Sequence, residues 1–456
     1  TYNTAVGHEA GGAVTTGVQN TFIGGLAGDA LNDADFNVAL GYASLSTDTR
    51  GSKSTALGWA SLNSQNFTTA VDSFNTAVGF QSGMVITTGI QNTFVGGLAG
   101  DGTDDGAYNV AVGHLALSAN CANSNVAVGY DALLAYTGGS AVAVGSDAFG
   151  SLTTGASNVA VGYHAGLFAT TADSSVFVGH QSGKGITGAK LTGNNNTCFG
   201  ANSGLLLQGA ANGNTLVGSS AGAALTTGEN NVFLGVGAGD AATTSANNTF
   251  VGRNSGGSGV VTGGSNSCLG INSGLNLTSG TNNSLIGNDS GVGGSPGGSF
   301  GTSSNGICLG DENISEANIQ VDWSVASDQR DKTDFTALDL GLDFVKALAP
   351  VTYKWDKRSK YGDKYADDYD LLDQTPDGTH KEDWLDIGFK AQEVEALEQA
   401  AGYNKSNKTN LMSSHTGDGK QMSLQYSKFI PILVKAIQEQ NALIEALTAR
   451  VATLEG

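Results

Sequence analysis

A serine and a lysine lie five residues apart in the stretch SDQRDK, which runs from Ser327 to Lys332. A serine hydroxyl attacks a carbonyl only when a base takes its proton, and a lysine can be that base once burial lowers its pKa toward neutrality. The pair therefore predicts a nucleophile and a general base that act on a nearby acyl group. Because the same spacing often arises by chance, a solvated charged linker is the alternative.

This stretch marks a sharp change of composition. Of the 68 glycines, 60 precede Ser327, and residues 1–326 carry 5 Lys and Arg against 19 Asp and Glu, whereas the remainder carries 16 against 22. Neither part has the clustered cations that phosphate contacts need, so we expect no nucleic-acid partner. No run of about 18 apolar residues is present, so we expect no membrane insertion. The chain begins at Thr1 without a Met, and we expect an upstream segment.

Before Ser327 the chain repeats a short unit of Asn or Ser, Thr or Val, an apolar residue, Val, Ile or Leu, and Gly. It reads NTAVGHEAG at Asn3 and NTFIGGLAG at Asn20, and the anchoring glycines are most often 17 residues apart. The unit is too short for a pair of helices, and TTG, NN and Gly punctuate it as turns do. Residues 1–326 are therefore predicted to form an all-β repeat shaft, a parallel β-roll or β-solenoid.

Side chains alternate across a strand, so each predicted strand has two faces. The residue just before the glycine shares one face with Thr or Val two places earlier. The residue between them belongs to a column that runs from Ala5 to Cys308, is apolar throughout and points the other way. We expect both faces to be buried, with this column against other copies of the chain. Cys198 and Cys268 also lie in the column, which indicates buried small hydrophobes and not a disulfide framework.

The repeat resembles the head repeats of trimeric autotransporter adhesins and the glycine-rich repeats of bacteriophage tail fibres. This resemblance covers roughly 320 residues, by the length over which the repeat persists. It implies a homotrimeric shaft and does not fix a function.

Three segments follow the change of composition: ALDLGLDFVKALAPVTYKW, DIGFKAQEVEAL and LQYSKFIPILVKAIQEQNALIEALTARVATLE. In this order they resemble the C-terminal intramolecular chaperone of phage tailspikes and endosialidases, a self-cleaving serine peptidase domain. The resemblance covers 327–456 and implies an α+β chaperone and autopeptidase domain that ends in a trimeric coiled-coil helix.

The same resemblance assigns roles to the residues of the SDQRDK stretch. It implies that Ser327 is the nucleophile, that Lys332 is the general base, and that the chain cuts itself between Ala326 and Ser327. Asp328 and Arg330 also match the family pattern, and we give them a positioning role.

The last helix predicted from the sequence has a coiled-coil pattern over about 433–455. Its apolar positions alternate by four and three residues, with one polar member, Gln440. They are Leu433, Ile437, Ile444, Leu447, Val451 and Leu454. A trimeriser here would set the register of repeats that otherwise pair slowly and slip. The alternative is an amphipathic helix packed on its own domain.

Aromatic residues recur just after the anchoring glycine, and four of them are candidates for stacking on the sugar rings of a cell-surface glycan: Tyr42, Trp59, Tyr130 and Tyr163. They share the parity of the Val column, so we favour a buried or corner-packed ladder. The acidic turn DGTDDG at 101–106 could hold a divalent cation, but an exposed turn is favoured. We expect no metal and no cofactor.

These features together predict the distal part of a homotrimeric phage tail fibre. Its partners would be a host cell-surface glycan or protein receptor and other virion tail proteins, and it would reach the virion after assembly in the host cytoplasm. The only enzymatic step expected is intramolecular self-cleavage. The alternatives are a tailspike that degrades a surface polysaccharide and a cellular trimeric adhesin.

Overall fold

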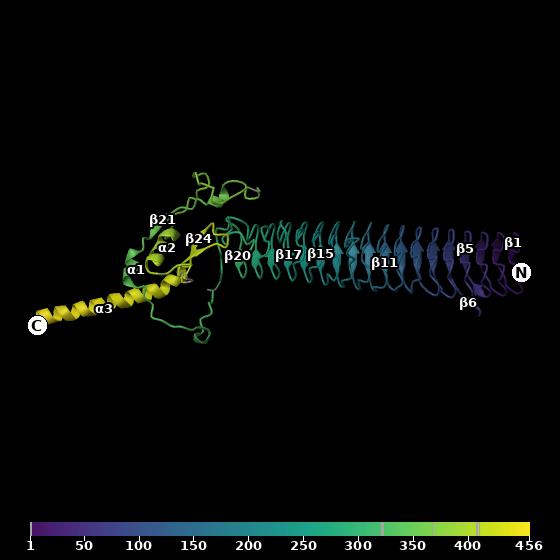
Figure 1. Ribbon diagram of the computed structural model, residues 1–456, viewed down its shortest axis with the longest axis horizontal. Helices are drawn as coiled ribbons and strands as arrows, with labels where there is room; N and C mark the ends of the chain where they lie inside the picture. The colour runs from purple at the N-terminus through teal and green to yellow at the C-terminus, as the bar shows by residue number, and fades with distance from the viewer. Residues whose placement is uncertain (1, 321–322, 367, 407–408, 410) are drawn as a thin grey trace. The chain divides into compact units, whose positions relative to one another are not determined.

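The computed structural model describes residues 2–320, 323–366, 368–406, 409 and 411–456. The chain forms two compact units, unit 1 (Thr1–Asn288) and unit 2 (Asp289–Gly456). Figure 1 colours the chain from purple at the start of unit 1 to yellow at the end of unit 2. The predicted domain boundary, between residues 326 and 327, lies within unit 2.

Unit 1 is a parallel β-solenoid, as predicted (Figure 1). Each repeat supplies one strand of three residues, and neighbouring strands pair in parallel register, so that Thr4 lies beside Thr21 and Ala5 beside Phe22. The strands are β1 (Thr4–Val6), β2 (Thr21–Ile23), β3 (Val38–Leu40), β5 (Thr55–Leu57), β7 (Thr76–Val78), β8 (Thr93–Val95), β9 (Val110–Val112), β10 (Val126–Val128), β11 (Val142–Val144), β12 (Val159–Val161), β13 (Val176–Val178), β14 (Thr197–Phe199), β15 (Thr215–Val217), β16 (Val232–Leu234), β17 (Thr249–Val251), β18 (Ser267–Leu269) and β19 (Ser284–Ile286). A small second sheet pairs β4 (Gly51–Ser52) with β6 (Val71–Asp72).

The glycine that follows each strand is required by the backbone. Gly79, for example, has a φ of +141°, and a Cβ atom on it would lie 2.3 Å from the carbonyl oxygen of Gly96 in the next coil. Glycine adopts this conformation without strain and lets the two backbones approach so closely. The repeat therefore keeps glycine at this place along the whole solenoid.

The column from Ala5 to Cys308 lies in the interior of its own chain, which corrects the prediction that it faces other copies. Its members are at most 3% exposed from Phe22 onward, and Ala5, in the first coil, is the exposed one. The prediction was wrong because it assumed that one coil cannot fill its own interior. Residues from the turns fill it instead, and among the largest are Leu31, Leu45, Leu62, Ile86, Leu117, Tyr136 and Phe149.

Buried asparagines link most coils of unit 1 to the next, with Ser54, Ala141 and Ser175 at this position in three coils. The backbone N–H of Asn109 donates to Oδ1 of Asn92 at 2.9 Å, and the side-chain amide of Asn92 donates to the carbonyl oxygen of Gly106 at 2.9 Å. An asparagine satisfies one buried donor and one buried acceptor at once, which explains its place just before the strand. This ladder fixes the stacking register of the coils.

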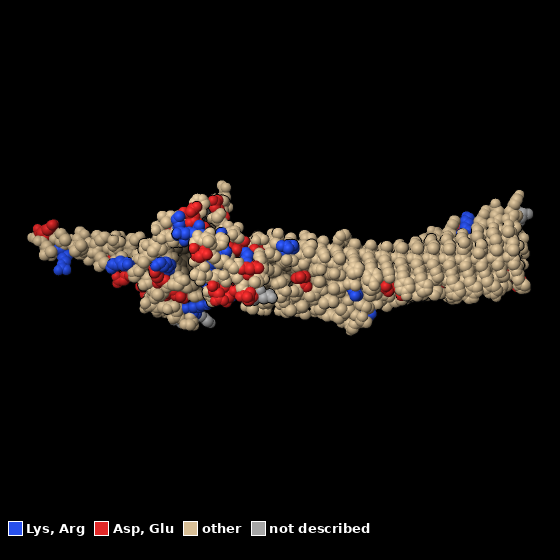
Figure 2. All heavy atoms as spheres, turned by 90° about the horizontal axis from the view of Figure 1, so that it is seen from above, with Lys and Arg blue, Asp and Glu red and all other residues tan. Residues whose placement is uncertain are grey.

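The other strand face points outward. Val144 and Val161 are each 37% exposed, and Leu234 is 48% exposed. No strand of the main sheet of unit 1 contains a charged residue; Asp72, in the small second sheet, is the charged strand residue of this unit. Figure 2 shows charged side chains sparse over the solenoid and gathered on unit 2. Unit 1 thus carries a long, uncharged and partly apolar outer face, a feature that marks interaction surfaces. The expected burial of both strand faces is not met within a single chain.

Unit 2 is a small α+β region that begins with the last turn of the solenoid. Its elements are β20 (Ile307–Leu309), η1 (Gln329–Asp331), α1 (Leu342–Ala347), β21 (Val351–Tyr353), η2 (Arg358–Lys360), β22 (Asp386–Gly388), α2 (Ala391–Ala400), β23 (Ser413–His415), β24 (Met422–Leu424), η3 (Tyr426–Lys428) and α3 (Phe429–Glu455). Strand β21 pairs with β22, and β23 with β24, both antiparallel. The core that joins α1, α2 and α3 consists of Leu340, Phe344, Val394, Met412, Phe429 and Ile432.

Candidate functional site

The structure brings Ser327 and Lys332 together. The Nζ atom of Lys332 lies 2.6 Å from the Oγ atom of Ser327, which is hydrogen-bonding distance. A serine and a lysine in direct contact have the geometry that general-base activation of the hydroxyl requires.

A short turn between the two residues makes this contact. Asp328 caps the 3-10 helix η1 by accepting a hydrogen bond from the backbone N–H of Arg330 at 2.9 Å. The guanidinium of Arg330 returns to the same carboxylate at 2.6 Å. These bonds hold the pKa of the Asp328 carboxyl below its usual value and raise that of Arg330. The turn reverses the chain and brings Lys332 back to Ser327, and Asp328 and Arg330, the two residues given a positioning role, both belong to this turn.

The whole site is exposed in a single chain. Both Ser327 and Lys332 lie in solvent, and nearby apolar side chains are uncovered, Trp323 at 74%, Val325 at 83% and Phe335 at 65%. Figure 1 shows the stretch around η1 as an open loop beside the rest of unit 2. A lysine amine becomes an effective base when it is removed from water. In a single chain this site therefore has the contact between Ser327 and Lys332 but not the burial of Lys332.

The comparison with protein families identifies the region that starts at this serine. Residues 327–403 match the family Peptidase_S74, described as the chaperone of endosialidase. The chain carries an endosialidase-type chaperone domain. Such intramolecular chaperone domains are typical of phage tail fibres and tailspikes, and membership implies autoproteolytic chaperone activity. No curated protein is significantly similar to the chain.

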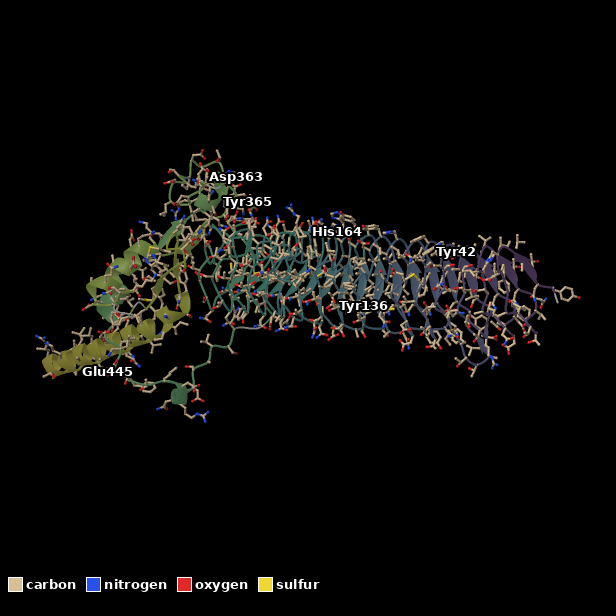
Figure 3. The ribbon with its side chains drawn as sticks, turned by 45° about the vertical axis from the view of Figure 1, so that its right-hand side comes forward. Tyr42, Tyr136, His164, Asp363, Tyr365 and Glu445 are labelled. Carbon is tan, nitrogen blue, oxygen red and sulfur yellow. The ribbon has the colours of Figure 1, made fainter. Side chains whose placement is uncertain are left out.

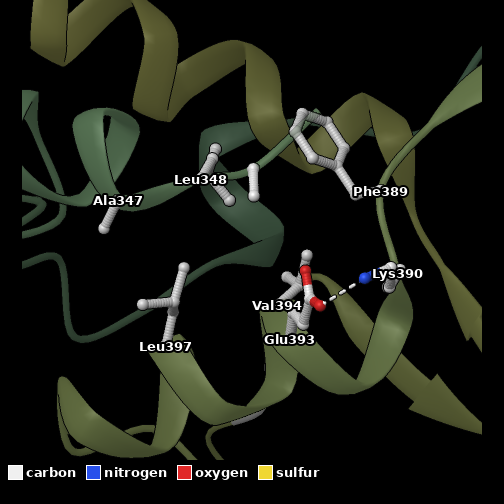
Figure 4. A pocket seen from close by; sticks show the side chains of 8 residues that line it. Ala347, Leu348, Phe389, Lys390, Glu393, Val394 and Leu397 are labelled. Carbon is white, nitrogen blue, oxygen red and sulfur yellow. Dashed lines mark hydrogen bonds and ion pairs between the residues drawn. The ribbon is translucent and has the colours of Figure 1, made fainter. Parts of the chain in front are cut away.

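The body of the chaperone domain contains an apolar hollow of about 250 Å³ between α1 and α2. Leu348, Phe389, Val394 and Leu397 line it, and one ion pair, Lys390 to Glu393 at 2.7 Å, closes its side (Figure 4). The two charged groups are largely exposed and pair with each other. The hollow therefore supplies no group for catalysis.

Helix α3 begins inside the chaperone domain and leaves it. Phe429, Ile432 and Ala436 are buried, and Oε2 of Glu439 accepts a hydrogen bond from the backbone N–H of Leu342 at 2.7 Å, at the start of α1. The apolar coiled-coil positions that follow are exposed. Their exposed fractions are 60% for Ile437, 52% for Ile444, 63% for Leu447, 43% for Val451 and 79% for Leu454. The helix is thus not packed along its length on its own domain.

The aromatic rings after the anchoring glycines form an exposed row, which corrects the burial expected in the favoured prediction of a buried or corner-packed ladder. Tyr42 (labelled in Figure 3) is 53% exposed, Trp59 45%, Tyr130 53% and Tyr163 47%. Rings in neighbouring coils stack, such as Trp59 on Phe80 with centroids 5.1 Å apart. The rings share the parity of the Val column as expected, but that column points outward.

The acidic turn at 101–106 does not gather its carboxylates. Asp101 accepts a hydrogen bond from Ser118, and Asp104 one from Thr87, each in a neighbouring coil. Within the part of the chain that the structure describes, no three His, Cys, Asp or Glu residues are grouped as metal ligands. Among the same residues, no helix has the length and hydropathy needed to cross a membrane.

Sequence reasoning missed a buried ion-pair cluster in unit 2. Lys364 contacts Asp289 and Glu312 at 2.9 Å each. The partners are separated from the lysine by more than 50 residues, and no sequence pattern connects them.

Proposed function

We propose that the chain is the distal part of a homotrimeric phage tail fibre whose chaperone domain assembles the shaft and is then cut from it. The observation that carries this proposal is the contact of 2.6 Å between Ser327 and Lys332, at the first residue of the family match. The finished fibre attaches to the host surface and joins other tail proteins in the virion.

The cleavage reaction needs only groups of the chain and one water molecule. Oγ of Ser327 attacks the carbonyl carbon of Ala326 while Nζ of Lys332 takes the hydroxyl proton. The peptide C–N bond breaks, the nitrogen of Ser327 takes that proton from Lys332, and an ester remains between Ala326 and Oγ of Ser327. Water hydrolyses the ester, which leaves a carboxylate on Ala326 and restores the hydroxyl.

Trimerisation completes the site in this proposal. The dyad and the apolar side chains around it are exposed in one chain, so a neighbouring copy supplies the cover that makes Lys332 an effective base. The exposed stripe of α3 has the four-and-three spacing of a coiled coil, and it brings the copies together. Cleavage then follows assembly and reports that the trimer is formed.

The shaft is the receptor-binding part. Aromatic rings stack on the apolar faces of sugars, and the exposed row with Tyr42, Trp59, Tyr130 and Tyr163 offers such rings at the spacing of successive coils. Each ring of the row follows the glycine at which the chain bends after a strand, so the row lies beside the strand face and not within it. We assign the uncharged strand face to contacts between the three chains, and the aromatic row to a cell-surface glycan.

A second candidate function is a tailspike that cleaves a surface polysaccharide. Burial, and then the charge of Asp147 in the next coil, raise the pKa of Asp131, and His164 lies 3.4 Å from Asp147. Glycosidases use a pair of carboxyl groups, one of which has a raised pKa and serves as the general acid. Release of reducing sugar from host polysaccharide would support this function, and loss of that release in Asp131→Asn would assign it.

The test of the main proposal is a comparison of four chains on a denaturing gel. Wild type and Lys346→Met should give two fragments, since Lys346 forms only an exposed pair with Asp343. Ser327→Ala and Lys332→Met should stay intact, with the oligomer unchanged on gel filtration. A Lys332→Met chain that cleaves at the wild-type rate would contradict the proposed dyad.

A further inference from the structure

The chaperone domain contacts residues on the far side of the proposed cleavage point. Residues 357–365 of the domain lie against 289–312, the last turn of the solenoid, and both stretches belong to unit 2. After cleavage between Ala326 and Ser327, these two stretches would belong to different polypeptides. Their contacts then decide whether the fragments separate.

The central contact consists of three charged side chains with little exposure, Lys364, Asp289 and Glu312, and the half-exposed Tyr365; we call it the Lys364 cluster. Nζ of Lys364 lies 2.9 Å from Oδ2 of Asp289 and 2.9 Å from Oε1 of Glu312. The three side chains are only 13%, 4% and 7% exposed. The hydroxyl of Tyr365, which is labelled in Figure 3, donates to Oδ2 of Asp289 at 2.6 Å.

The charges of the cluster divide between the two sides of the cut. Both carboxylates belong to the shaft side, and the single cation belongs to the chaperone side. Burial lowers the pKa of Lys364, but the hydrogen bonds and charges of the two carboxylates outweigh this and raise it above its ordinary value. The lysine therefore stays charged, and separation would leave two neighbouring carboxylates without their counter-charge.

Two further contacts join the two sides of the cut. Nζ of Lys357 donates to the backbone carbonyl oxygen of Glu312 at 2.9 Å. The backbone N–H of Ser299 donates to Oδ2 of Asp418 at 2.9 Å. The side chains along the connection that would be cut add little packing, because residues such as Trp323, Val325 and Phe335 are exposed.

We propose that the Lys364 cluster is a retention clamp, which holds the cleaved chaperone domain on the end of the shaft. Cutting the exposed connection removes the covalent link and leaves the clamp closed. The chaperone then leaves only when the clamp opens, so cleavage and release are separate steps. This inference rests on the proposed function for its biological setting, but the clamp can be tested without self-cleavage.

The test uses a Ser327→Ala chain with a site-specific protease sequence inserted after Ser324. The protease cuts the exposed loop whether or not the dyad works, so a failed clamp and a failed dyad are distinguishable. The cut protein is passed over a gel-filtration column, and the free chaperone fragment is measured. We expect the two fragments to elute together.

Substitutions on both sides of the cut then test the cluster. Lys364→Met, and separately the double change Asp289→Asn with Glu312→Gln, should each raise the free fraction at least tenfold. Lys346→Met is the control, since its pair with Asp343 is exposed, and it should not release the fragment. Circular dichroism and elution of each uncut protein show that it is folded. Release of the unsubstituted fragment at once, or retention by folded Lys364→Met as in the control, would overturn the clamp.

Discussion

The amine of Lys332 lies 2.6 Å from the hydroxyl of Ser327, and the turn capped by Asp328 holds the two together. The contact forms within a single chain, where both side chains are exposed to solvent. The contact between the two groups is therefore formed locally, and in the proposed mechanism assembly supplies the desolvation that favours proton transfer.

Weakening the turn should slow self-cleavage without removing either dyad residue. Asp328→Ala loses the cap of η1 and the bond to Arg330, and an N-cap is worth about 1 kcal/mol. We expect roughly a five- to tenfold slower cleavage, and Asp328→Asn should recover most of the rate because asparagine also caps. Densitometry of fragments over time measures this. Equal rates for alanine and wild type would remove Asp328 from the positioning role.

Charge substitutions on the two strand faces should have different effects. Ala111→Asp places a charge in the closed interior of a coil, where Ala111 is 0% exposed, and should destabilise the shaft by about 3–5 kcal/mol or prevent folding. Val144→Asp lies on the outer face at 37% exposure. It should leave the circular dichroism spectrum of the shaft intact but lower the trimer fraction by light scattering.

The two variants, Ala111→Asp and Val144→Asp, also test which strand face points into the coil and which points outward. If Val144→Asp unfolds the shaft and Ala111→Asp folds normally, the assignment of inner and outer face is inverted. If Val144→Asp forms trimers of unchanged stability, the outer strand face does not contact the other chains.

Exposed apolar residues of α3 should be needed during assembly. Replacing Ile444 and Leu447 by Asp puts charges in the coiled-coil stripe, and expression should then yield aggregated or monomeric repeats. A matched control is Gln438→Asp with Glu445→Gln, at exposed positions outside the four-and-three spacing. Normal trimers from the first variant would show that the repeats register themselves.

Acid should loosen the contact between the shaft end and the chaperone domain. Burial raises the pKa of Asp418, but hydrogen bonds from the Ser299 N–H and the Thr416 hydroxyl outweigh it and leave this pKa below its usual value, while Lys420 faces the same carboxylate. A carboxyl with a lowered pKa stabilises the attached state above about pH 4 and loses this effect as the pH falls further. The protease-cut complex should therefore release more fragment at pH 3 than at pH 6.

Part of the acid effect should depend on the carboxyl of Asp418. In Asp418→Asn, retention should be weaker at pH 6 and should change less between pH 6 and pH 3. An unchanged pH profile in that variant would assign the acid sensitivity to other carboxyls.

The sequence predicted the features that depend on neighbours along the chain. The 17-residue spacing and the glycine that ends each strand are local signals, and together they predicted the parallel stacking. The four residues between Ser327 and Lys332 form a single turn, so the contact of these two side chains could be predicted from their spacing.

Features that depend on distant residues were not predictable in the same way. Alternation shows that a strand has two faces, but turn residues such as Leu45 and Leu117 decide which face is filled from within the coil. Tyr130 and the other rings are exposed because they lie on the same side as the strand face that points outward. Lys364 finds its carboxylates through the folding of unit 2, and a single sequence carries no trace of such a pairing.

The most direct test of self-cleavage is the intact mass of the purified wild-type protein after incubation under native conditions. We predict two masses, one for a shaft that ends at Ala326 and one for a fragment of residues 327–456 that begins with Ser327. N-terminal sequencing of the smaller fragment should begin Ser-Asp-Gln-Arg. A single full-length mass after several days, or a cut at any other bond, would contradict the assignment of Ser327 as the nucleophile.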